Sequence, residues 1–486
     1  MSRSEVEIEA GGAADQAKRV LGRGSVFTIA TVFQLGAGIL IIPVLTRTVD
    51  PEEYGLITAA LVVQAVAATT AAFGAPAAVQ RTYFRRGGPE GARALICAVA
   101  AAAVLFGLLA ELTGPLWSQV FEGVDYGTEL RLAVLAAVPN AIMLAAQTFL
   151  QAAERARIYV LCAVISTAGG QVLGLVLTLL DHGATGYLAG IAIGFWAGAI
   201  VAWSAAGFDA RPLRRARGGR DLLRRALLVG LPTVPSALAL YLLSAGDRVI
   251  VERLEGLAAA GAYYIAYAVG SLAIFLVTAL NTAWGPILFG VDRRDRWRLL
   301  AASAVEVTRV VALAAAALAV GAPLALELFA PADYAIDGLG SVSALIAVSG
   351  LFYVWYITSY NVILWRGRTG TLAWATPLST AVNLGLCAAL IPPMGLEGAA
   401  LATLVSYGLL ALLTWARART MADVPWDVPA LARSAAPAAV GVALALALPD
   451  DGGWIGLRGV LAAAFGLWAL GLLAVSLRHS RSGSVL

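Results

Sequence analysis

Histidine is nearly absent from this chain, which has only His182 and His479 among 486 residues. One lies in a short loop between apolar segments and the other in the C-terminal tail, so a centre built on histidine, whether for metal binding or for acid–base catalysis, is not expected. Cysteine is scarce as well. Cys97, Cys162 and Cys387 each fall inside an apolar run, which indicates small buried side chains rather than a disulfide or a metal site. We therefore expect no metal and no cofactor.

Charged residues are also rare. They make up 13% of the sequence, against roughly 25% in ordinary soluble domains, whereas hydrophobic residues make up 60%. No stretch outside the apolar runs is long enough to bury a core of its own, so a large water-soluble catalytic domain is excluded. The runs are continuous rather than alternating, which excludes an outer-membrane barrel. The first 24 residues mix acidic and basic side chains, and no removable signal peptide is expected.

Fourteen apolar runs have the length of a membrane span, since a spanning helix takes about 20 apolar residues. We therefore expect an all-α polytopic membrane protein with short loops. The last two runs are rich in alanine and are the weakest of the set. The expected spans are residues 25–46, 56–79, 94–116, 131–150, 158–180, 184–206, 226–246, 259–289, 304–326, 338–364, 371–391, 395–416, 431–448 and 455–476.

Lysine and arginine alternate between the two sets of loops. Of the 34, 28 fall in the N-terminal segment, in the loops after every second span and in the tail, and five fall in the opposite loops. The positive-inside rule then predicts a multi-pass protein of the cell membrane with both termini in the cytoplasm. Because the excess of arginine reflects topology, no nucleic-acid partner is expected.

The most basic stretch is RPLRRARGGRDLLRR at 211–225, between the sixth and seventh spans. We interpret it as a cytoplasmic anchor that lies against anionic lipids of the bilayer. The sharper alternative is a dock for an anionic lipid-linked substrate.

Two segments on either side of this basic loop repeat a spacing. In LTRTVDPEEYG at 45–55 and VERLEGLAAAG at 251–261, an arginine precedes a glycine by eight positions. GATGYLAG at 183–190 and GLEGAALA at 395–402 also correspond, each at the start of the last span of a set of six. An even number of spans per repeat predicts two lobes related by an axis along the membrane normal. The expected organisation is a cytoplasmic N-terminal segment (1–24), an N-lobe (25–206), a basic inter-lobe loop (207–225), a C-lobe (226–416) and two C-terminal helices with the tail (417–486).

These motifs resemble a known family. LTRTVDPEEYGLI at 45–57, GLPTVPS at 230–236, DRVIVERL at 247–254 and GAYYIAYAVGSL at 261–272 are similar to segments of the polysaccharide or oligosaccharide-lipid flippases of the multidrug/oligosaccharidyl-lipid/polysaccharide (MOP) superfamily. The resemblance covers roughly residues 20–416. It implies a V-shaped bundle of two lobes that flips an undecaprenyl-pyrophosphate-linked glycan from the inner to the outer leaflet by alternating access, for polysaccharide biosynthesis.

A pyrophosphate cargo needs cations in the cavity, and arginine suits it because its planar fork donates two parallel hydrogen bonds to phosphate oxygens. Glu306 and Arg309, with i, i+3 spacing, form either an internal ion pair or part of a substrate site. Asp247 and Arg248 end the seventh expected span, where they are either a helix end in the headgroup region or cavity residues. Few charged side chains fall within or beside the spans, and the candidates are the cations Arg47, Arg248, Arg253 and Arg309 together with the acid Asp247.

Polar and aromatic side chains inside the spans complete the list of cavity candidates. Gln34 and Asn281 either bond between helices or face the cavity. Trp355 and Tyr356 fall near the middle of the tenth expected span, where they either pack in the core or stack on sugars. Proline breaks the backbone hydrogen-bond ladder, so we expect the lobes to flex at three positions, which are Pro43, Pro232 and Pro235.

Two other functions stay open. A drug or cation antiporter of the same superfamily would need a buried acid to exchange for Na⁺ or H⁺, and in the N-lobe Glu111 is the only acid well inside, at shallow depth. An integral membrane glycosyltransferase or polymerase would need catalytic carboxylates on a sizeable outer loop, whereas the longest loops are expected to be cytoplasmic. We therefore expect a transporter and not an enzyme. Its expected partners are a lipid-linked glycan, the bilayer, and a glycan polymerase and glycosyltransferases.

Overall fold

The computed structural model describes residues 36, 38–84, 88–207, 211, 216–290, 295–336, 338–366, 368–450 and 453–481. Within these residues every regular element is a helix and no strand is present. The expected all-α polytopic fold is therefore confirmed. The segment 1–24 and most of the first expected span, Gln34 included, lie outside the described residues.

The first described helix covers residues 38–45, and α2 follows after a short turn in which the Asp50 carboxylate accepts a 2.8 Å hydrogen bond from the backbone N–H of Glu53. An aspartate cap followed by proline at the first helical position is a strong start signal for a helix. The α-helices are α2 (Pro51–Ala71), α3 (Ala75–Tyr83), α4 (Gly88–Leu112), α5 (Gly114–Trp117), α6 (Thr128–Ala152), α7 (Ala156–Ala163), α8 (Gly170–Leu177), α9 (Gly183–Ala206), α11 (Ala216–Gly230), α12 (Val234–Ala245), α13 (Asp247–Glu255), α14 (Leu257–Gly290), α15 (Arg296–Val320), α16 (Ala322–Phe329), α17 (Gly340–Trp365), α18 (Leu372–Met394), α19 (Leu396–Arg419), α20 (Val428–Ala447) and α21 (Trp454–Arg481).

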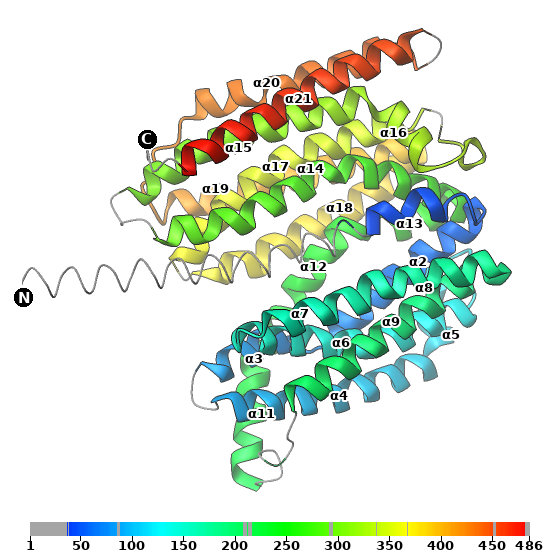
Figure 1. Cartoon of the computed structure of the whole chain (residues 1–486), viewed down its shortest axis with the longest axis vertical. Helices are drawn as coiled ribbons and strands as arrows, with labels where there is room; N and C mark the ends of the chain where they lie inside the picture. The colour runs from blue at the N-terminus through cyan, green and yellow to red at the C-terminus, as the bar shows by residue number, and fades with distance from the viewer. Residues whose placement is uncertain are drawn as a thin grey trace, which may run out of the picture.

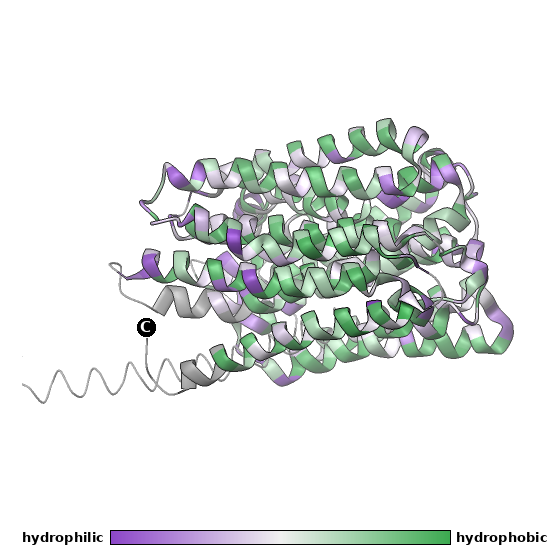
Figure 2. Cartoon of the chain, turned by 90° about the horizontal axis from the view of Figure 1, so that it is seen from above, coloured by the Kyte–Doolittle hydropathy of each residue, from purple (hydrophilic) through white to green (hydrophobic). Residues whose placement is uncertain are grey.

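Twelve helical stretches among the described residues are long and apolar enough to cross a membrane. One of them, Ala156–Ala206, has 51 residues and contains the fifth and sixth expected spans, because the chain reverses direction inside it. At the reversal Asp181 (φ 63°) and Gly183 (φ 50°) have positive φ. With this reversal and the partly described first helix, the fourteen expected spans are accounted for. Figure 2 shows that hydrophilic residues gather mainly at the two ends of the bundle, as a membrane requires.

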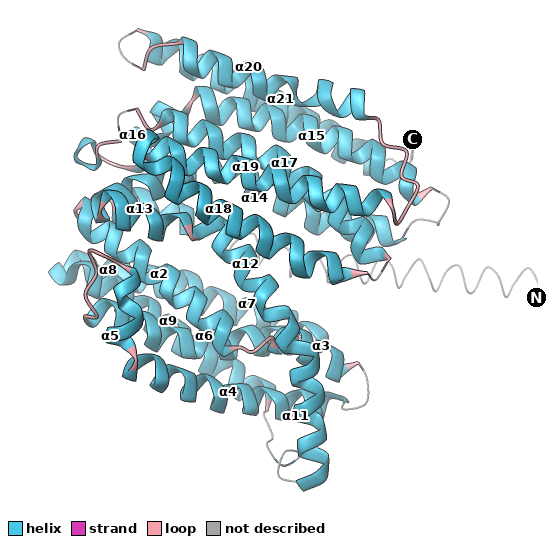
Figure 3. Ribbon diagram, turned by 180° about the vertical axis from the view of Figure 1, so that it is seen from behind, coloured by secondary structure: helices cyan, strands magenta, loops and turns pink. Residues whose placement is uncertain are grey.

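The helices form two groups that lie side by side (Figure 1). We call α2–α9 with α11 the N-lobe, and α12–α19 the C-lobe, and Figure 3 shows the same division from behind. The chain passes from α11 of the N-lobe into α12 of the C-lobe. α12 packs on α18, where the Ala239 carbonyl accepts a 2.6 Å hydrogen bond from the Thr380 hydroxyl.

The joint between α11 and α12 is built from glycine and proline. α11 lies crosswise to the spans at one end of the N-lobe and packs on α3 and α4 (Figure 3). A Cβ atom on Gly74 would lie 2.0 Å from the carbonyl oxygen of Gly230, so the two backbones touch. Pro232 then sits in a 3₁₀ turn and Pro235 in the first turn of α12. The chain therefore leaves the N-lobe at a tight contact and bends at two of the expected hinge prolines.

The seventh expected span is followed directly by another helix, α13. Residues 226–246 were expected, with Asp247 and Arg248 as a possible helix end in the headgroup region. Gly246 instead keeps helical angles (φ −74°, ψ −24°), and α13 runs on to Gly256, whose φ of 89° ends it. Asp247 thus lies eight residues, or about 12 Å of helix, before the end of α13. Asp247 and Arg248 thus begin α13, directly after the candidate span Gly219–Ala245, and the chain keeps helical angles across Gly246.

The two C-terminal helices pack on the C-lobe through α15 (Figure 1). A Cβ atom on Gly441 of α20 would lie 2.4 Å from the Cα of Ala316. Arg458 of α21 is 2% exposed, and its guanidinium donates to the carbonyls of Val320, Ala445, Leu448 and Pro449 and pairs with Asp450 at 2.5 Å. One buried arginine therefore ties the end of α15, the end of α20 and the start of α21 together.

Candidate functional site

Among the described residues, Asp247 of α13 is the most buried acid. Its carboxylate is completely buried. One oxygen, Oδ2, accepts hydrogen bonds from the Tyr263 hydroxyl at 2.6 Å and the Thr403 hydroxyl at 3.3 Å. The other accepts from the backbone N–H of Arg248 at 3.0 Å. A buried carboxylate is tolerated in a membrane protein only with such partners, so this cluster is a deliberate polar site inside the C-lobe.

Asn383 extends the cluster. Its Nδ2 donates to the Thr403 hydroxyl at 3.4 Å, and its side chain is fully buried. Its Oδ1 has no hydrogen-bond partner among the described residues. Carboxylate, hydroxyl and amide oxygens from α13, α19 and α18 therefore converge on one buried spot, and one of them retains free acceptor capacity.

Arg248 is the next residue along α13 and lies about 100° further around the helix. Its guanidinium carbon lies 4.1 Å from the ring centroid of Tyr264 and 5.3 Å from that of Tyr267, both on α14. Stacking on two aromatic faces holds a planar cation without using its hydrogen-bond donors. The Nε atom is buried and has no partner in the part of the chain that the structure describes. Arg248 therefore keeps an unused donor.

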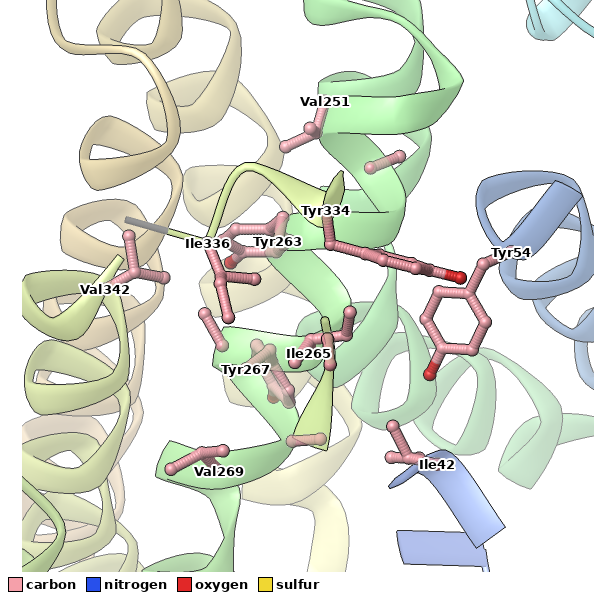
Figure 4. Close-up of a cluster of buried hydrophobic side chains, with 14 of the residues drawn as sticks. Ile42, Tyr54, Val251, Tyr263, Ile265, Tyr267, Val269, Tyr334, Ile336 and Val342 are labelled. Carbon is pink, nitrogen blue, oxygen red and sulfur yellow. The ribbon is translucent and has the colours of Figure 1, made fainter. Parts of the chain in front are cut away.

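Tyr54 of α2, in the N-lobe, packs on the tyrosine ring that lies under Arg248. The Tyr54 ring lies 5.9 Å from the Tyr264 ring and 5.8 Å from the Tyr334 ring, and Figure 4 shows Tyr54 and Tyr334 side by side. The Tyr54 hydroxyl is buried and bonds to none of the described residues. Tyrosine rings from both lobes thus line one meeting point beside Arg248.

At one end of the interface between the lobes, two arginines each donate a hydrogen bond to a backbone carbonyl of the other lobe. Arg47, after the first span, donates to the carbonyl of Leu328 in α16 of the C-lobe at 3.1 Å. Arg253, on α13, donates to the carbonyl of Val120 in the N-lobe at 3.3 Å. Arg47 and Arg253 occupy matching places in the sequence repeat, and their acceptors follow the ninth and the third span respectively. Each arginine therefore crosses to the equivalent segment of the opposite lobe.

Further hydrogen bonds join the lobes at this same end. The Tyr334 hydroxyl donates to the carbonyl of Val49 at 2.8 Å, and the Thr46 hydroxyl donates to the carbonyl of Phe329 at 2.6 Å. Burial raises the pKa of the Tyr334 hydroxyl above its ordinary value, so it keeps its proton and remains a donor at neutral pH.

α2 and α13 complete the closure. The Glu252 carboxylate, 2% exposed, accepts a 2.7 Å hydrogen bond from the backbone N–H of Gly123 in the N-lobe. A Cβ atom on Gly55 would lie 2.0 Å from the carbonyl oxygen of Leu257, and one on Gly261 would lie 3.2 Å from the backbone nitrogen of Gly55. We call this end of the interface the sealed end; it comprises residues 46–55, 118–123, 252–261 and 328–334.

The other candidates lie apart from this site. Arg309 pairs with Glu306 at 3.1 Å on α15, and both side chains are exposed. Asn281 accepts a 3.1 Å hydrogen bond from Asn361 between α14 and α17. Both pairs are therefore interactions between protein side chains.

Trp355 and Tyr356 lie within α17. Tyr356 is 5% exposed and packs on the rings of Tyr353 and Tyr360. Trp355 packs on Phe352. Tyr356 therefore belongs to the core of the C-lobe, whereas Trp355 is partly buried and its Nε1 bonds to none of the described residues. Pro43 lies in the helix over 38–45, where its carbonyl accepts from Arg47.

Sequence reasoning missed several residues of the site. Tyr54, Tyr264, Glu252, Thr403 and Tyr334 were not singled out. The available signal was the run GAYYIAYAVG, which places Tyr263, Tyr264 and Tyr267 within one turn of helix beside the charged end of the seventh span. Across the described ranges, no group of three or more His, Cys, Asp or Glu residues is placed to hold a metal ion.

Known proteins resemble this chain in sequence and in fold. A family model described as polysaccharide biosynthesis protein matches residues 21–291. The fold is similar to that of lipid II flippase MurJ in an inward closed conformation (TM-score 0.64, 14% identity, 93% of this chain and 99% of that chain covered). It is also similar to an inward-facing multidrug resistance MATE family transporter of the MOP superfamily (0.60, 17%, 83% and 96%) and to a MOP superfamily transporter from Pyrococcus furiosus (0.59, 16%, 81% and 94%). No curated protein matches the chain. At these identities the likeness shows a shared fold.

Proposed function

The chain belongs to the polysaccharide biosynthesis protein family, and from that premise we propose that it flips an undecaprenyl-pyrophosphate-linked oligosaccharide across the cell membrane by alternating access. The family assignment and the MOP transporter fold make it a multi-pass membrane protein of the flippase type. The glycan, its lipid carrier and the direction of movement are the parts that we add.

The observation that carries this proposal is Arg248. A pyrophosphate must cross about 30 Å of hydrocarbon, where every charge needs a partner. Arg248 is held between two tyrosine rings at the meeting point of the lobes and keeps a buried, unused donor. Arginine donates to phosphate oxygens through parallel hydrogen bonds, and tyrosine faces suit sugar rings. The site therefore offers both chemistries that a lipid-linked glycan needs.

The sealed end supports alternating access. Arginine, tyrosine and glutamate contacts close the interface there, and the arginines pair with carbonyls rather than with carboxylates. Such single hydrogen bonds are individually worth about 1 kcal/mol, so they can break and re-form during a transport cycle. We take the sealed end as the outer face, because the positive-inside rule puts the basic loops on the opposite, cytoplasmic side. We propose that the structure is the state that loads substrate from the cytoplasm.

Transport itself is tested with purified full-length protein in liposomes that contain a fluorescent undecaprenyl-pyrophosphate-linked oligosaccharide. An impermeant reagent that attacks the glycan destroys only the label in the outer leaflet. We expect the protein to move labelled lipid from the inner leaflet outward, so that this label is destroyed faster than in protein-free liposomes. A matched fluorescent phosphatidylcholine should not be accelerated. Equal movement of both lipids would mean a scramblase, and acceleration of neither would rule out this substrate class.

The sidedness is tested by cysteine labelling. In a variant without native cysteines, Arg224→Cys in the basic loop should react with an impermeant thiol reagent only after the cells are opened. Asp333→Cys, on the exposed loop at the sealed end, should react in intact cells. The reverse pattern would turn the protein over and make the sealed end cytoplasmic.

A second function, exchange of a cation by a drug or cation antiporter, has one observation in its favour. Asp247 is the fully buried acid that such a transporter needs, and Asn383 offers a free amide oxygen beside it. The same cluster would equally couple glycan transport to Na⁺ or H⁺. Asp247 bonds to Tyr263 and Thr403, whereas the guanidinium of Arg248 lies over other rings, so the two side chains have different partners.

The role of Asp247 is tested by transport against a cation gradient. We expect an inward gradient of Na⁺ or H⁺ to stimulate wild-type glycan transport and to have no effect on Asp247→Asn, which preserves shape and removes charge. Glu306→Gln, which removes one exposed acid of an ion pair, is the matched control and should retain stimulation. Stimulation that survives Asp247→Asn would remove this residue from coupling, and drug movement in place of glycan movement would favour the antiporter.

A further inference from the structure

α11 has two faces with different surroundings. Leu222 and Ala226 pack against the buried cluster of the N-lobe, and a Cβ atom on Gly91 of α4 would lie 3.8 Å from Leu222 Cδ1. The next face around the helix is uncovered. On it Leu227 is 48% exposed and Leu228 67% exposed. An amphipathic helix that packs on protein along one side thus presents a second apolar side to its surroundings.

This second face forms a hollow of about 650 Å³. Its residues follow one another at intervals of one, three or four positions, which places them along one side of a helix. The basic residues lie toward the start of α11 and the leucines toward the span α12, over about 16 Å of helix. The hollow is lined by Arg220, Leu223, Arg224, Leu227, Leu228, Leu231 and Pro232.

The place of α11 in the fold decides which ligand fits. α11 lies crosswise to the other spans at the end of the N-lobe, and the candidate span Gly219–Ala245 runs from α11 into α12 (Figure 3). A basic amphipathic helix in this attitude sits at the level of the lipid headgroups, with its apolar side in the acyl chains. The arginines therefore face the phosphate layer, and the leucines that follow face the hydrocarbon.

We propose that this hollow is a binding site for one acidic phospholipid of the bilayer, with its phosphate between Arg220 and Arg224 and its acyl chains over Leu227 and Leu231. Arginine pairs bind phosphate oxygens strongly, and exposed leucines next to them exclude a small soluble phosphate as the natural ligand. The lipid is a constituent of the membrane and not the cargo, so the site is independent of the transported substrate.

The site sits at the joint between the lobes. Gly230, at the end of α11, touches the backbone of Gly74 in the N-lobe, and the next residues lead through Pro232 into α12. A lipid bound along α11 and Leu231 would bridge the fixed helix and the bend that follows it. The lipid therefore holds the N-lobe end of the connection in place in the membrane plane.

The proposal is tested with the full-length protein in detergent, by native mass spectrometry during titration with phosphatidylglycerol or with phosphatidylcholine of the same chain length. We expect one phosphatidylglycerol to bind in preference to phosphatidylcholine. Arg220→Gln/Arg224→Gln should weaken phosphatidylglycerol binding by about thirtyfold, since each basic residue near anionic lipid contributes about 1 kcal/mol. The control Arg157→Gln/Arg433→Gln removes the same charge from exposed positions elsewhere and should leave binding unchanged. Arg224→Gln alone serves if the double variant does not fold.

Further variants and probes distinguish binding through apolar contacts, unspecific charge attraction and binding of the transported substrate. Leu227→Ser/Leu231→Ser should weaken the binding of both lipids, because it removes the apolar floor. An equal loss in the control variant would mean unspecific charge attraction and would overturn the site. Undecaprenyl phosphate is the third probe. If it binds to the hollow and phosphatidylglycerol does not displace it, the hollow belongs to the substrate and the proposal is wrong.

Discussion

Replacing Arg248 by alanine is expected to slow transport of the pyrophosphate-linked glycan by about a hundredfold, because two charge-assisted hydrogen bonds of about 1.5 kcal/mol each are lost. The protein should still fold in the membrane. The side chain rests on tyrosine rings and its Nε bonds to no residue that the structure describes, and alanine keeps the backbone N–H that bonds the Asp247 carboxylate. The measurement is the initial rate of glycan movement in liposomes.

Two further variants make this result specific. Arg248→Lys keeps the charge and loses the planar fork, so its rate should fall between those of wild type and alanine. Arg309→Ala removes a cation from an exposed pair on α15 and should transport at close to the wild-type rate. A wild-type rate for Arg248→Ala would take this residue out of the substrate path, and an equal loss for Arg309→Ala would point to a general effect of charge.

Gly55→Ala is expected to abolish transport by preventing the lobes from meeting at the sealed end. The added Cβ would lie 2.0 Å from the carbonyl oxygen of Leu257, and a backbone atom of a packed helix cannot move aside as a flexible side chain does. The variant should insert and fold, because the clash lies between the lobes and not within one. Spin labels at Glu122 and Glu255, which are exposed on opposite lobes, should move apart relative to wild type.

The glycines of the chain supply graded controls for this prediction. Gly261→Ala brings its Cβ to 2.9 Å from the Pro51 carbonyl oxygen, so it should impair transport less than Gly55→Ala. Gly385→Ala, in α18, has no atom within 4 Å of the new Cβ and should behave as wild type. Unchanged label distances in Gly55→Ala would show that the sealed end closes differently from the arrangement described.

The sequence repeat predicted more of the site than its simplicity suggests. Arg47 with Gly55 and Arg253 with Gly261 were recognised only as a spacing. In the structure both arginines cross to the opposite lobe, and the two glycines approach each other where α2 meets α14. The spacing is the same in both lobes because the contact is the same. In each lobe an arginine bonds to a carbonyl of the other lobe, and a glycine lies where the two helices approach closely. Only the coordinates show which carbonyl each arginine reaches.

The interior of the site was harder to predict. Asp247 follows a glycine and precedes several charged residues, a pattern typical of a helix end, and hydropathy alone stops the span there. The helix continues because Gly246 is helical and because Tyr263 and Thr403 compensate the buried carboxylate. Those partners lie 16 and 156 positions away in the sequence. Apolar runs reveal which segments cross the membrane, whereas pairings between distant helices determine how deep a charge is tolerated.

The buried Arg458 has a consequence for the way the molecule moves. A guanidinium that holds carbonyls from two helix ends cannot be released into hydrocarbon without losing several strong bonds at once. The last two helices are therefore fixed to the C-lobe. We expect the C-lobe to tilt together with them as a single rigid body. The outer surface of these two helices moves with that body. A protein bound to this surface would therefore be displaced in every transport cycle.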